Sequence, residues 1–147
     1  MKNRNIVHKD DRETPDSLYA ELNKEFNFDF DPCPLCHDIK KWNGLQVEWG
    51  MSNFINPPYS RKSKEAFINK AVLESKKGKV CVMLLPVSTS TKILHEVILP
   101  NKKEIRFIKG RVKFKGVNTK GEYVESKSGM HDSMIVVFDP APGKEKE

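Results

Sequence analysis

Long apolar runs are missing from this 147-residue sequence. None approaches the ~20 apolar residues that span a bilayer, and the first residues contain no apolar stretch of the kind that a signal peptide needs. We therefore expect a cytoplasmic protein with no membrane contact. Cysteine is scarce as well, since the three residues Cys33, Cys36 and Cys81 cannot all pair with one another. In a reducing compartment we expect them to be free thiols.

Acidic residues are too few to balance the basic ones. The sequence has 26 Lys and Arg residues against 20 Asp and Glu residues, which gives a net charge of +6. This surplus favours an acidic partner such as nucleic acid. Much of it lies between residues 102 and 115, where Glu104 is the one acidic residue. The basic residues of this stretch are Lys102, Lys103, Arg106, Lys109, Arg111, Lys113 and Lys115.

Internal repeats and linker-like stretches are also missing, so residues 1–147 are expected to form a single domain. A domain of this size buries roughly 68–70% of the surface that its unfolded chain exposes, which is enough for a hydrophobic core. The segments 1–13 and 140–147 are expected to be flexible because they are polar and show no periodicity.

The apolar periodicity predicts alternating helices and strands. A helix starts at Thr14-Pro15 and places Leu18, Leu22 and Phe26 on one face. The continuous apolar run over 80–85 predicts a strand that is covered on both faces. The other predicted elements are strands over 28–31, 53–55, 104–108, 111–115 and 134–138, helices over 63–77 and 91–99, and a loop over 116–131. Together they predict an α/β fold, with an open, mostly parallel sheet, helices on both faces and an antiparallel C-terminal hairpin.

The strongest candidate site is Asn56-Pro57-Pro58-Tyr59. It follows a predicted strand and precedes a helix, and ligands of open α/β sheets bind at the carboxyl ends of strands. The prolines fix the backbone, so that the Asn56 amide oxygen and the Pro57 carbonyl face outward as two acceptors suited to one NH₂ group. Tyr59 adds a ring on which a planar base can stack. The alternative is a proline-rich loop with a packed tyrosine.

Several segments of the chain, taken in their order, resemble a known family. They are TPDSLYAELNKEF, FDFDPCP, NGLQVEW, FINPPYS, VCVMLLP followed by VSTSTKILHE, EIRFIKGRVKF and HDSMIVVFDP. This set resembles the phage-encoded DNA N-6-adenine methyltransferases, small Dam-type enzymes that use S-adenosylmethionine. NPPY alone occurs in amino-methylating enzymes of several substrate classes, and the ordered set is far more specific. The resemblance implies a reduced, Rossmann-like methyltransferase fold, with double-stranded DNA as the partner.

For such an enzyme, the residues Asn56, Pro57, Pro58 and Tyr59 would be catalytic. When the target amine donates its hydrogens to Asn56 and to the Pro57 carbonyl, its lone pair can point at the methyl group. Positioning and desolvation would then supply most of the rate without a strong general base. Because the target base lies inside the duplex stack, it must be flipped out, and Tyr59 would stack on it.

The resemblance also implies where the cofactor binds. Thr14-Pro15 matches the front motif of the family, and Asp31-Pro32-Cys33 resembles the motif at a strand end whose acidic residue and backbone meet the cofactor. Larger methyltransferases continue from this point into a glycine-rich turn, whereas residues 33–38 contain no glycine. The small phage enzymes share this shortened pattern. The implied cofactor-binding residues are Thr14, Pro15, Asp31, Pro32, Cys33 and Asn56.

Residues 33–37 leave metal alternatives open. Cys33-x-x-Cys36-His37 spells the attachment motif of c-type haem, but the sequence has no export signal. Zinc could use the two thiols and the imidazole, but a closed structural site needs four ligands and no second cluster follows. We expect no metal and a loop near the cofactor. His95 and His131 are expected to be surface or hydrogen-bonded residues because the proposed chemistry needs no acid–base group.

Three groups of residues are candidates for DNA contacts. Hydroxyls and a lysine just past the buried strand suit phosphate binding, although an ordinary helix cap would look the same. Basic residues alternate within 111–115 and share one face of the predicted strand, although a solvated edge would have the same pattern. Further basic residues follow the NPPY motif. The expected DNA contacts are Arg61, Lys62, Ser88, Thr89, Thr91, Lys92, Arg111, Lys113 and Lys115.

The sequence thus predicts a phage or prophage enzyme that transfers a methyl group from S-adenosylmethionine to the N-6 amine of adenine at specific sites in DNA. It gives no sign of an obligate protein partner. One alternative is an amino-methyltransferase that acts on RNA or on a protein glutamine, for which NPPY is equally apt. Another is a degenerate methyltransferase fold that binds DNA without catalysis, and cofactor binding would distinguish it.

Overall fold

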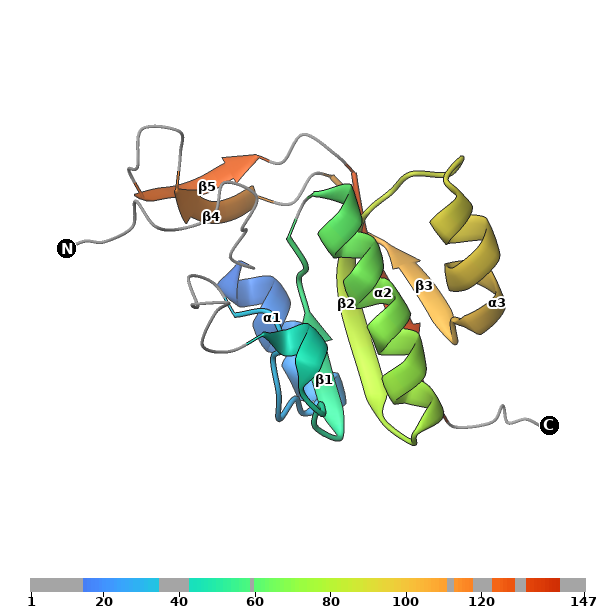
Figure 1. The fold of residues 1–147 in the computed structure, drawn as a ribbon. Coiled ribbons are helices and arrows are strands. Elements are labelled where there is room, and N and C mark those ends of the chain that lie inside the picture. The colour runs from blue at the N-terminus through green and yellow to red at the C-terminus, as the bar shows by residue number, and fades with distance from the viewer. Residues whose placement is uncertain are drawn as a thin grey trace.

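A four-stranded sheet forms the centre of the computed structural model (Figure 1). The structure describes residues 15–34, 43–58, 60–110, 113–117, 123–128 and 132–140, with the backbone alone for 113–117 and 123–128. The elements are α1 (Asp16–Phe26), η2 (Gly44–Gln46), β1 (Ser52–Ile55), α2 (Arg61–Lys76), β2 (Val80–Pro86), η3 (Leu94–Ile98), α3 (Leu99–Asn101), β3 (Glu104–Phe107), β4 (Lys113–Val117), β5 (Tyr123–Ser128) and β6 (Ser133–Phe138). The expectation of flexible ends falls on residues that lie almost entirely outside these ranges.

The central sheet is mixed, with the strand order β1-β2-β6-β3. β1 pairs with β2 in parallel, from Ser52 opposite Val80 to Ile55 opposite Met83. β6 lies antiparallel between β2 and β3. The prediction of a mostly parallel sheet is therefore wrong, because the last strand enters between two earlier ones in the opposite direction. Periodicity indicates that a segment is a strand and which faces it buries, but not its direction.

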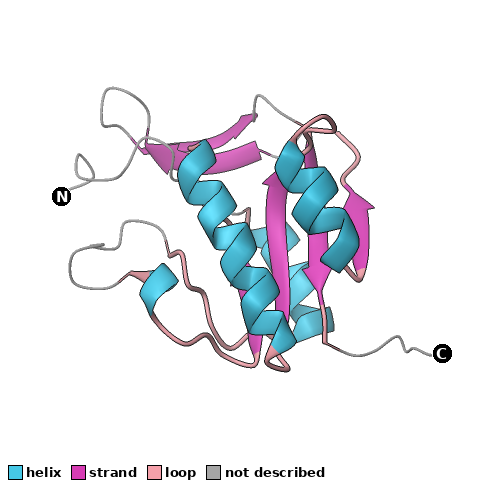
Figure 2. Ribbon diagram, turned by 45° about the vertical axis from the view of Figure 1, so that its right-hand side comes forward, coloured by secondary structure: helices cyan, strands magenta, loops and turns pink. Residues whose placement is uncertain are grey.

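Helices cover both faces of this sheet, as predicted (Figure 2). α1 packs on one face, where Leu22 contacts a cluster with Phe54, Val82 and Leu84. α2 and the η3–α3 segment pack on the other face. Alternate residues of β2 face the two layers, so the apolar run over 80–85 is covered on both sides, with five consecutive buried residues. This confirms the prediction made for the run.

Three elements differ from the expected pattern. The strand predicted over 28–31 is reduced to an isolated parallel bridge between Phe30 and Asn53. The helix predicted over 91–99 is present, but Leu94–Ile98 is wound as a π-helix, and the Leu99 N–H donates to the Leu94 carbonyl five residues back. Pro100, which has no N–H to donate, follows directly. Residues 123–128, expected to be loop, form β5 and pair antiparallel with β4 as a separate hairpin. A hairpin is therefore present, but it precedes the last strand of the central sheet.

Spatial neighbours balance part of the basic stretch over 102–115. The Arg106 guanidinium lies between the carboxylates of Glu25 and Glu104, with its Nη1 2.7 Å from Glu25 and its Nε 2.8 Å from Glu104. Lys103 forms an ion pair with Asp139 at 3.2 Å. Within the stretch itself Glu104 is the one acidic residue, but the fold adds Glu25 and Asp139, which are distant in sequence.

Among the described residues, no helix is both long and apolar enough to cross a membrane.

A buried ion cluster joins α2 to the start of β2. The side chain of Glu74 is fully buried and accepts hydrogen bonds from Lys70 at 2.9 Å and from the Trp49 N–H at 3.3 Å. Lys79, whose side chain is 8% exposed, bonds to Glu74 and also to the Trp49 carbonyl at 2.9 Å. Burial alone raises the pKa of Glu74, but the hydrogen bonds, chiefly those from Lys79 and Lys70, lower it to about 2. Glu74 is therefore charged, and in this form it holds Trp49, in the segment before β1, against α2.

Glu74→Gln should lower the free energy of unfolding by about 3 kcal/mol, because it removes the buried carboxylate that pairs with Lys79 and Lys70. Of the two carboxylates that pair with it, Lys79 then keeps only the exposed one of Glu48, at 2.9 Å. The pKa of Glu74 is lowered from 4.5 to about 2, so the stabilisation from the charged form is present above pH 4.5 and is lost as the pH falls toward 2. Urea denaturation at several pH values measures both effects. Lys76→Gln, on the exposed side of the same helix, should change stability by less than about 0.5 kcal/mol.

Candidate active site and an adjacent basic cavity

The turn after β1 carries the strongest site predicted from the sequence. β1 ends at Ile55, and the chain continues through the half-buried Asn56, the buried Pro57 and the half-buried Pro58. The prolines have no N–H to donate, so parallel pairing with β2 cannot continue past this point. Tyr59 lies outside the described residues. Three of the four residues predicted to be catalytic are thus placed at the carboxyl edge of the sheet.

The segment with Asp31 runs beside β1 and ends at the same edge. The Phe54 N–H donates to the Phe30 carbonyl at 3.1 Å, and this contact forms a parallel bridge between Phe30 and Asn53. After the bridge, the Asp31 carboxylate accepts a hydrogen bond from the Cys33 N–H at 2.8 Å and turns the chain. Parallel strands end at one edge of a sheet. Asp31-Pro32-Cys33 therefore reaches the edge that holds Asn56, as the predicted cofactor site requires.

Gly44 supports this turn from outside. A Cβ atom at Gly44 would overlap the carbonyl of Pro32, which is itself buried. The Gly44 carbonyl accepts a hydrogen bond from the Trp49 indole at 2.8 Å, and Trp49 packs in the core against α2. This close approach is possible only without a side chain. The block NGLQVEW thus fixes the position of the Asp31 turn.

Tyr19 on α1 is a candidate site residue that is absent from the residues predicted from the sequence. Its ring packs against Phe54 in a T-shaped arrangement, with the ring centroids 5.3 Å apart. The centroid of the Phe28 ring lies 5.6 Å away. Burial raises the pKa of its hydroxyl, and the negative charge of Asp31 raises it further. Tyr19 therefore lies on the α1 side of the edge, close enough to Asp31 for that charge to act on its hydroxyl. Its position in a helix that starts at the TP motif was the signal in the sequence.

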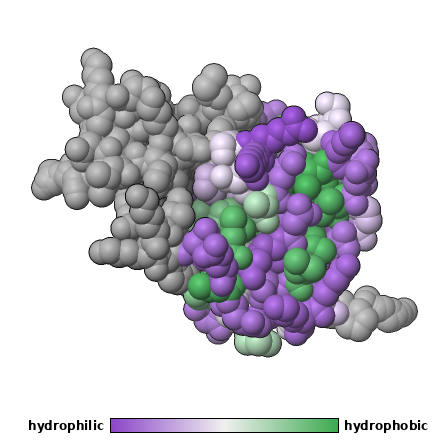
Figure 3. Space-filling model, in the orientation of Figure 1, coloured by the Kyte–Doolittle hydropathy of each residue, from purple (hydrophilic) through white to green (hydrophobic). Residues whose placement is uncertain are grey.

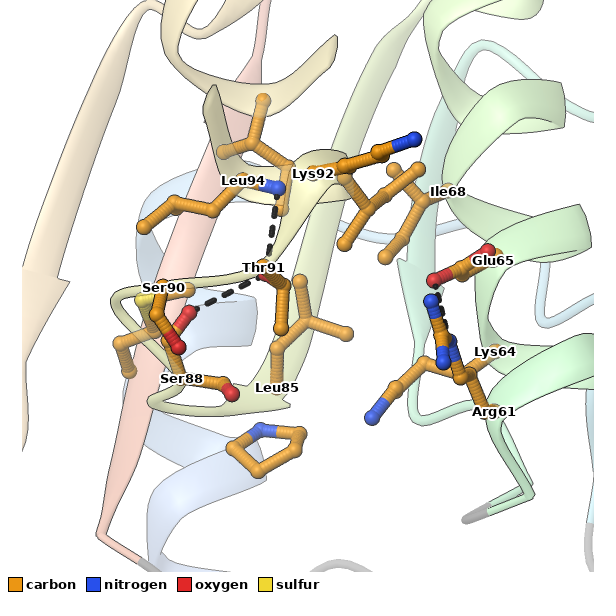
Figure 4. A pocket seen from close by; sticks show the side chains of 14 residues that line it. Arg61, Lys64, Glu65, Ile68, Leu85, Ser88, Ser90, Thr91, Lys92 and Leu94 are labelled. Atoms are coloured by element: carbon orange, nitrogen blue, oxygen red, sulfur yellow. Dashed lines mark hydrogen bonds and ion pairs between the residues drawn. The ribbon is translucent and has the colours of Figure 1, made fainter. Parts of the chain in front are cut away.

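A cavity of about 460 Å³ lies on the other side of this edge, between α2 and the segment that follows β2 (Figure 4). Its α2 wall carries Arg61, Lys64 and Glu65, and the opposite wall carries hydroxyls and Lys92. The apolar floor is formed by the buried residues Ile68, Leu85, Leu94, Ile98 and Met134. On the face shown in Figure 3, hydrophilic side chains cover most of the described surface, with smaller hydrophobic areas between them.

The cavity brings together four of the nine residues expected to contact DNA. They are Arg61, Ser88, Thr91 and Lys92. Lys62 is exposed on α2 outside the cavity lining. Lys64 and Ser90 line the cavity but were not among the expected contacts. Residues three or four apart share a helix face, so the spacing of 61, 64, 65 and 68 could have identified Lys64.

Part of the hydroxyl-bearing segment after β2 forms hydrogen bonds within the segment itself and with the helix that follows. The Thr91 hydroxyl donates to the Ser88 carbonyl at 3.1 Å and accepts from the Leu94 N–H at 3.4 Å, so Thr91 caps the following helix. His95 is exposed, and its Nε2 lies 2.7 Å from the Thr89 carbonyl. The helix-cap interpretation is therefore confirmed for Thr91, and His95 is a hydrogen-bonded surface residue as expected.

Several predicted residues lie outside what the structure describes. Thr14, Cys36, His37, Arg111 and His131 are not among the described residues, and the side chains of Lys113 and Lys115 are not described either. Within the described part, no cluster of three His, Cys, Asp or Glu side chains is arranged to hold a metal. Of the cysteines, Cys33 is half-buried, and burial raises the pKa of the Cys81 thiol to about 12.

Fold and site together define an α/β protein with a proline-fixed amide at one strand end, a carboxylate turn beside it and a basic cavity next to both. The family model for DNA N-6-adenine-methyltransferase (Dam) matches residues 2–146. The chain belongs to this family, whose activity is methylation of the N-6 amine of adenine in DNA. A comparison with curated proteins gave no significant match.

Asp31→Asn should lower the pKa of the Tyr19 hydroxyl, because it removes the negative charge that disfavours the tyrosinate. The pKa should stay above its ordinary value, since burial contributes most of the shift. Spectrophotometric titration of tyrosinate absorbance measures the pKa, and the part of the signal that is lost in Tyr19→Phe belongs to Tyr19. Glu21→Gln, on an exposed position of the same helix, should leave the titration unchanged. An unchanged titration in Asp31→Asn would show that the two side chains are not neighbours.

Proposed function

We propose that the protein transfers the methyl group of S-adenosylmethionine to the N-6 amine of adenine at specific sites in DNA. The observation that carries the proposal is the position of Asn56-Pro57 at the carboxyl end of β1, beside the Asp31 turn, in a chain of the Dam family. The DNA substrate follows from the family. S-adenosylmethionine as the methyl donor is what the family resemblance implies, and the roles of the individual residues are proposed from the geometry of this edge.

Asn56 and Pro57 act on the target amine. The exocyclic amine of adenine is a weak nucleophile because its lone pair is delocalised into the ring. When it donates one hydrogen to the Asn56 amide oxygen and the other to the Pro57 carbonyl, the nitrogen approaches a tetrahedral geometry and the lone pair becomes available. Pro58 keeps these acceptors fixed, so little reorganisation is needed at the moment of reaction. Tyr59 stacks on the flipped base.

The Asp31 turn and Tyr19 form the cofactor side of the edge. The residues fit the group: S-adenosylmethionine carries amino and hydroxyl donors for the Asp31 carboxylate, and the Tyr19 ring is 37% exposed next to it. When bound, the cofactor supplies an electrophilic methyl group. Thr14 and Pro15, at the start of α1, and Cys33 complete the proposed set. Pro32 is buried and held by Gly44, so it positions the turn.

Basic residues around the edge hold the DNA backbone. Arg61 and Lys92 reach the cavity mouth from two elements, and Lys62 lies on the exposed side of α2. Arg111, Lys113 and Lys115 are proposed to follow the phosphates further along. Phosphate contacts of this kind orient the duplex without reading its sequence. The test of the function is incubation with labelled S-adenosylmethionine and DNA of differing adenine content, with RNA and protein as alternative acceptors. Label in RNA or protein and not in DNA would contradict the proposal.

Asn56→Ala should lower the rate of DNA methylation by about 10²-fold or more, as the loss of a preorganised polar contact does in other enzymes. The affinity for S-adenosylmethionine should change little if the amide serves mainly the target amine. Single-turnover methylation and calorimetry separate the two effects. Asn69→Ala, on an exposed position of α2, is the matched control and should retain full activity. Wild-type rates in Asn56→Ala would exclude the mechanism.

S-adenosylmethionine should bind the free protein and raise its melting temperature, since a ligand at a hundredfold excess over its dissociation constant contributes about 2.7 kcal/mol. Asp31→Ala should reduce this shift. Glu96→Ala, an exposed carboxylate on η3, should not. If neither the cofactor nor its demethylated product gives a calorimetric signal, the result contradicts the proposed cofactor site and favours the alternative of a degenerate fold that binds DNA without catalysis.

The triple variant Arg111→Gln, Lys113→Gln and Lys115→Gln should flatten the slope of log affinity against log salt for duplex DNA by about 2–3, since each phosphate contact contributes about 0.9. Binding should weaken alike for all sequences, because phosphates carry no base identity. Fluorescence anisotropy at several salt concentrations measures the slope. Lys24→Gln with Lys76→Gln serves as a control on exposed helix positions. An unchanged slope in the triple variant would make this strand a solvated edge.

A further inference from the structure

The cavity between α2 and the segment after β2 is a separate site from the Asn56 turn. Asn56 and Pro57 do not line it, whereas Leu85 and Pro86 at the end of β2 do. We propose that this cavity binds one nucleotide unit, with the phosphate at the basic rim that carries Lys64 and Lys92 and the base over the apolar floor. That the nucleotide belongs to the DNA strand next to the target adenine rests on the proposed function. The binding of a nucleotide as such does not.

The size of the cavity calls for more than a phosphate. A volume of about 460 Å³ falls within the range of about 300–1,000 Å³ that is typical of small-molecule sites. Its floor consists of aliphatic and thioether side chains, of which Ile68, Ile98 and Met134 are at most 3% exposed. A flat base can pack against such a floor, whereas an isolated phosphate would make no apolar contact with it. The cavity thus combines an apolar floor with a polar rim.

The charge on the rim selects an anion. Arg61, Lys64 and Lys92 stand against the one carboxylate of Glu65, which forms an ion pair with Arg61 at 3.2 Å. Lys64 and Lys92 form no ion pair with any residue that the structure describes. Lys64 belongs to the α2 wall beside Arg61, and Lys92 belongs to the opposite wall, at the other end of the cavity (Figure 4). Ammonium groups without protein carboxylates on the rim of a cavity suit an anionic group such as a phosphate.

Positive charge at the start of α2 is unfavourable for the helix itself. The first turn of α2 carries Arg61 and Lys62 and no acidic residue. Positive charge at a helix N-terminus opposes the helix dipole, and Asp or Glu would be favoured there. A bound anion removes this conflict, because it is attracted both by the side chains and by the helix end. The exposed Ser88 and Ser90 hydroxyls can donate to its remaining oxygens.

The experiment uses thymidine 5′-monophosphate as the free probe, because it carries a phosphate and a base but no adenine amine for the Asn56 turn. Calorimetry compares the full chain with Lys64→Gln/Lys92→Gln and with Ser90→Trp, which fills the cavity without changing charge. Lys24→Gln/Lys76→Gln makes the same charge change on exposed helix positions away from the cavity. We expect both cavity variants to lose about tenfold or more in affinity, equivalent to about 1.4 kcal/mol, and the control to stay within about twofold. Thymidine without phosphate should bind about tenfold more weakly than its monophosphate.

Kinetics with duplex DNA then identify the source of the nucleotide. A raised KM for DNA with unchanged kcat in both cavity variants assigns the site to a nucleotide of the DNA strand. An unchanged KM together with lost monophosphate binding assigns it to a free nucleotide. If the wild type does not bind the monophosphate, or if the control loses as much affinity as the cavity variants, the inference is overturned. Absence of methylation in the wild type would overturn the proposed function and leave the calorimetric result to decide on the cavity.

Discussion

The parallel pairing of β1 with β2 is the constraint on which the site depends. β2 is buried on both faces and hydrogen-bonded on both edges, so it cannot shift without exposing two clusters of the core. Its register with β1 fixes where Ile55 ends, and the bridge from Phe30 fixes where the Asp31 turn begins. Because all three segments run in the same direction, their carboxyl ends meet at one edge. The ion cluster around Glu74 secures this arrangement from the far end of α2.

The edge divides into two sides with different chemistry. On the α1 side, Tyr19 and Asp31 present a ring and a carboxylate, which suit a ligand with a flat base and hydrogen-bond donors. On the α2 side, Lys64 and Lys92 present positive charge above an apolar floor. Asn56 lies between them at the end of β1. In the proposed function, the methyl donor would lie on the α1 side and the DNA on the α2 side, so that the target amine at Asn56 could approach the methyl group.

Local structure and function compete in two places. The basic first turn of α2 opposes its own helix dipole, and the hydroxyl segment after β2 uses Thr91 as a helix cap while it lines the cavity. Features that lower local stability without a structural gain are typical of functional surfaces. By contrast, the Arg106 contacts with Glu25 and Glu104 are complete within the protein. Its charge therefore serves the contact between β3 and α1.

Much of the fold was already determined by the sequence. The helices α1 and α2 and the strands β2, β3 and β6 follow from apolar periodicity, and the end of β1 follows from Pro57-Pro58, because these are local properties of the chain. The placement of Asp31 near Asn56 followed from the rule that parallel strands end together. The direction of β6, the balance of Arg106 by Glu25 and the neighbourhood of Tyr19 and Asp31 depend on residues far apart in sequence, so only the tertiary structure decided them. The cavity is of the same kind, since its two walls come from segments that share no local pattern and meet only when β2 brings them together.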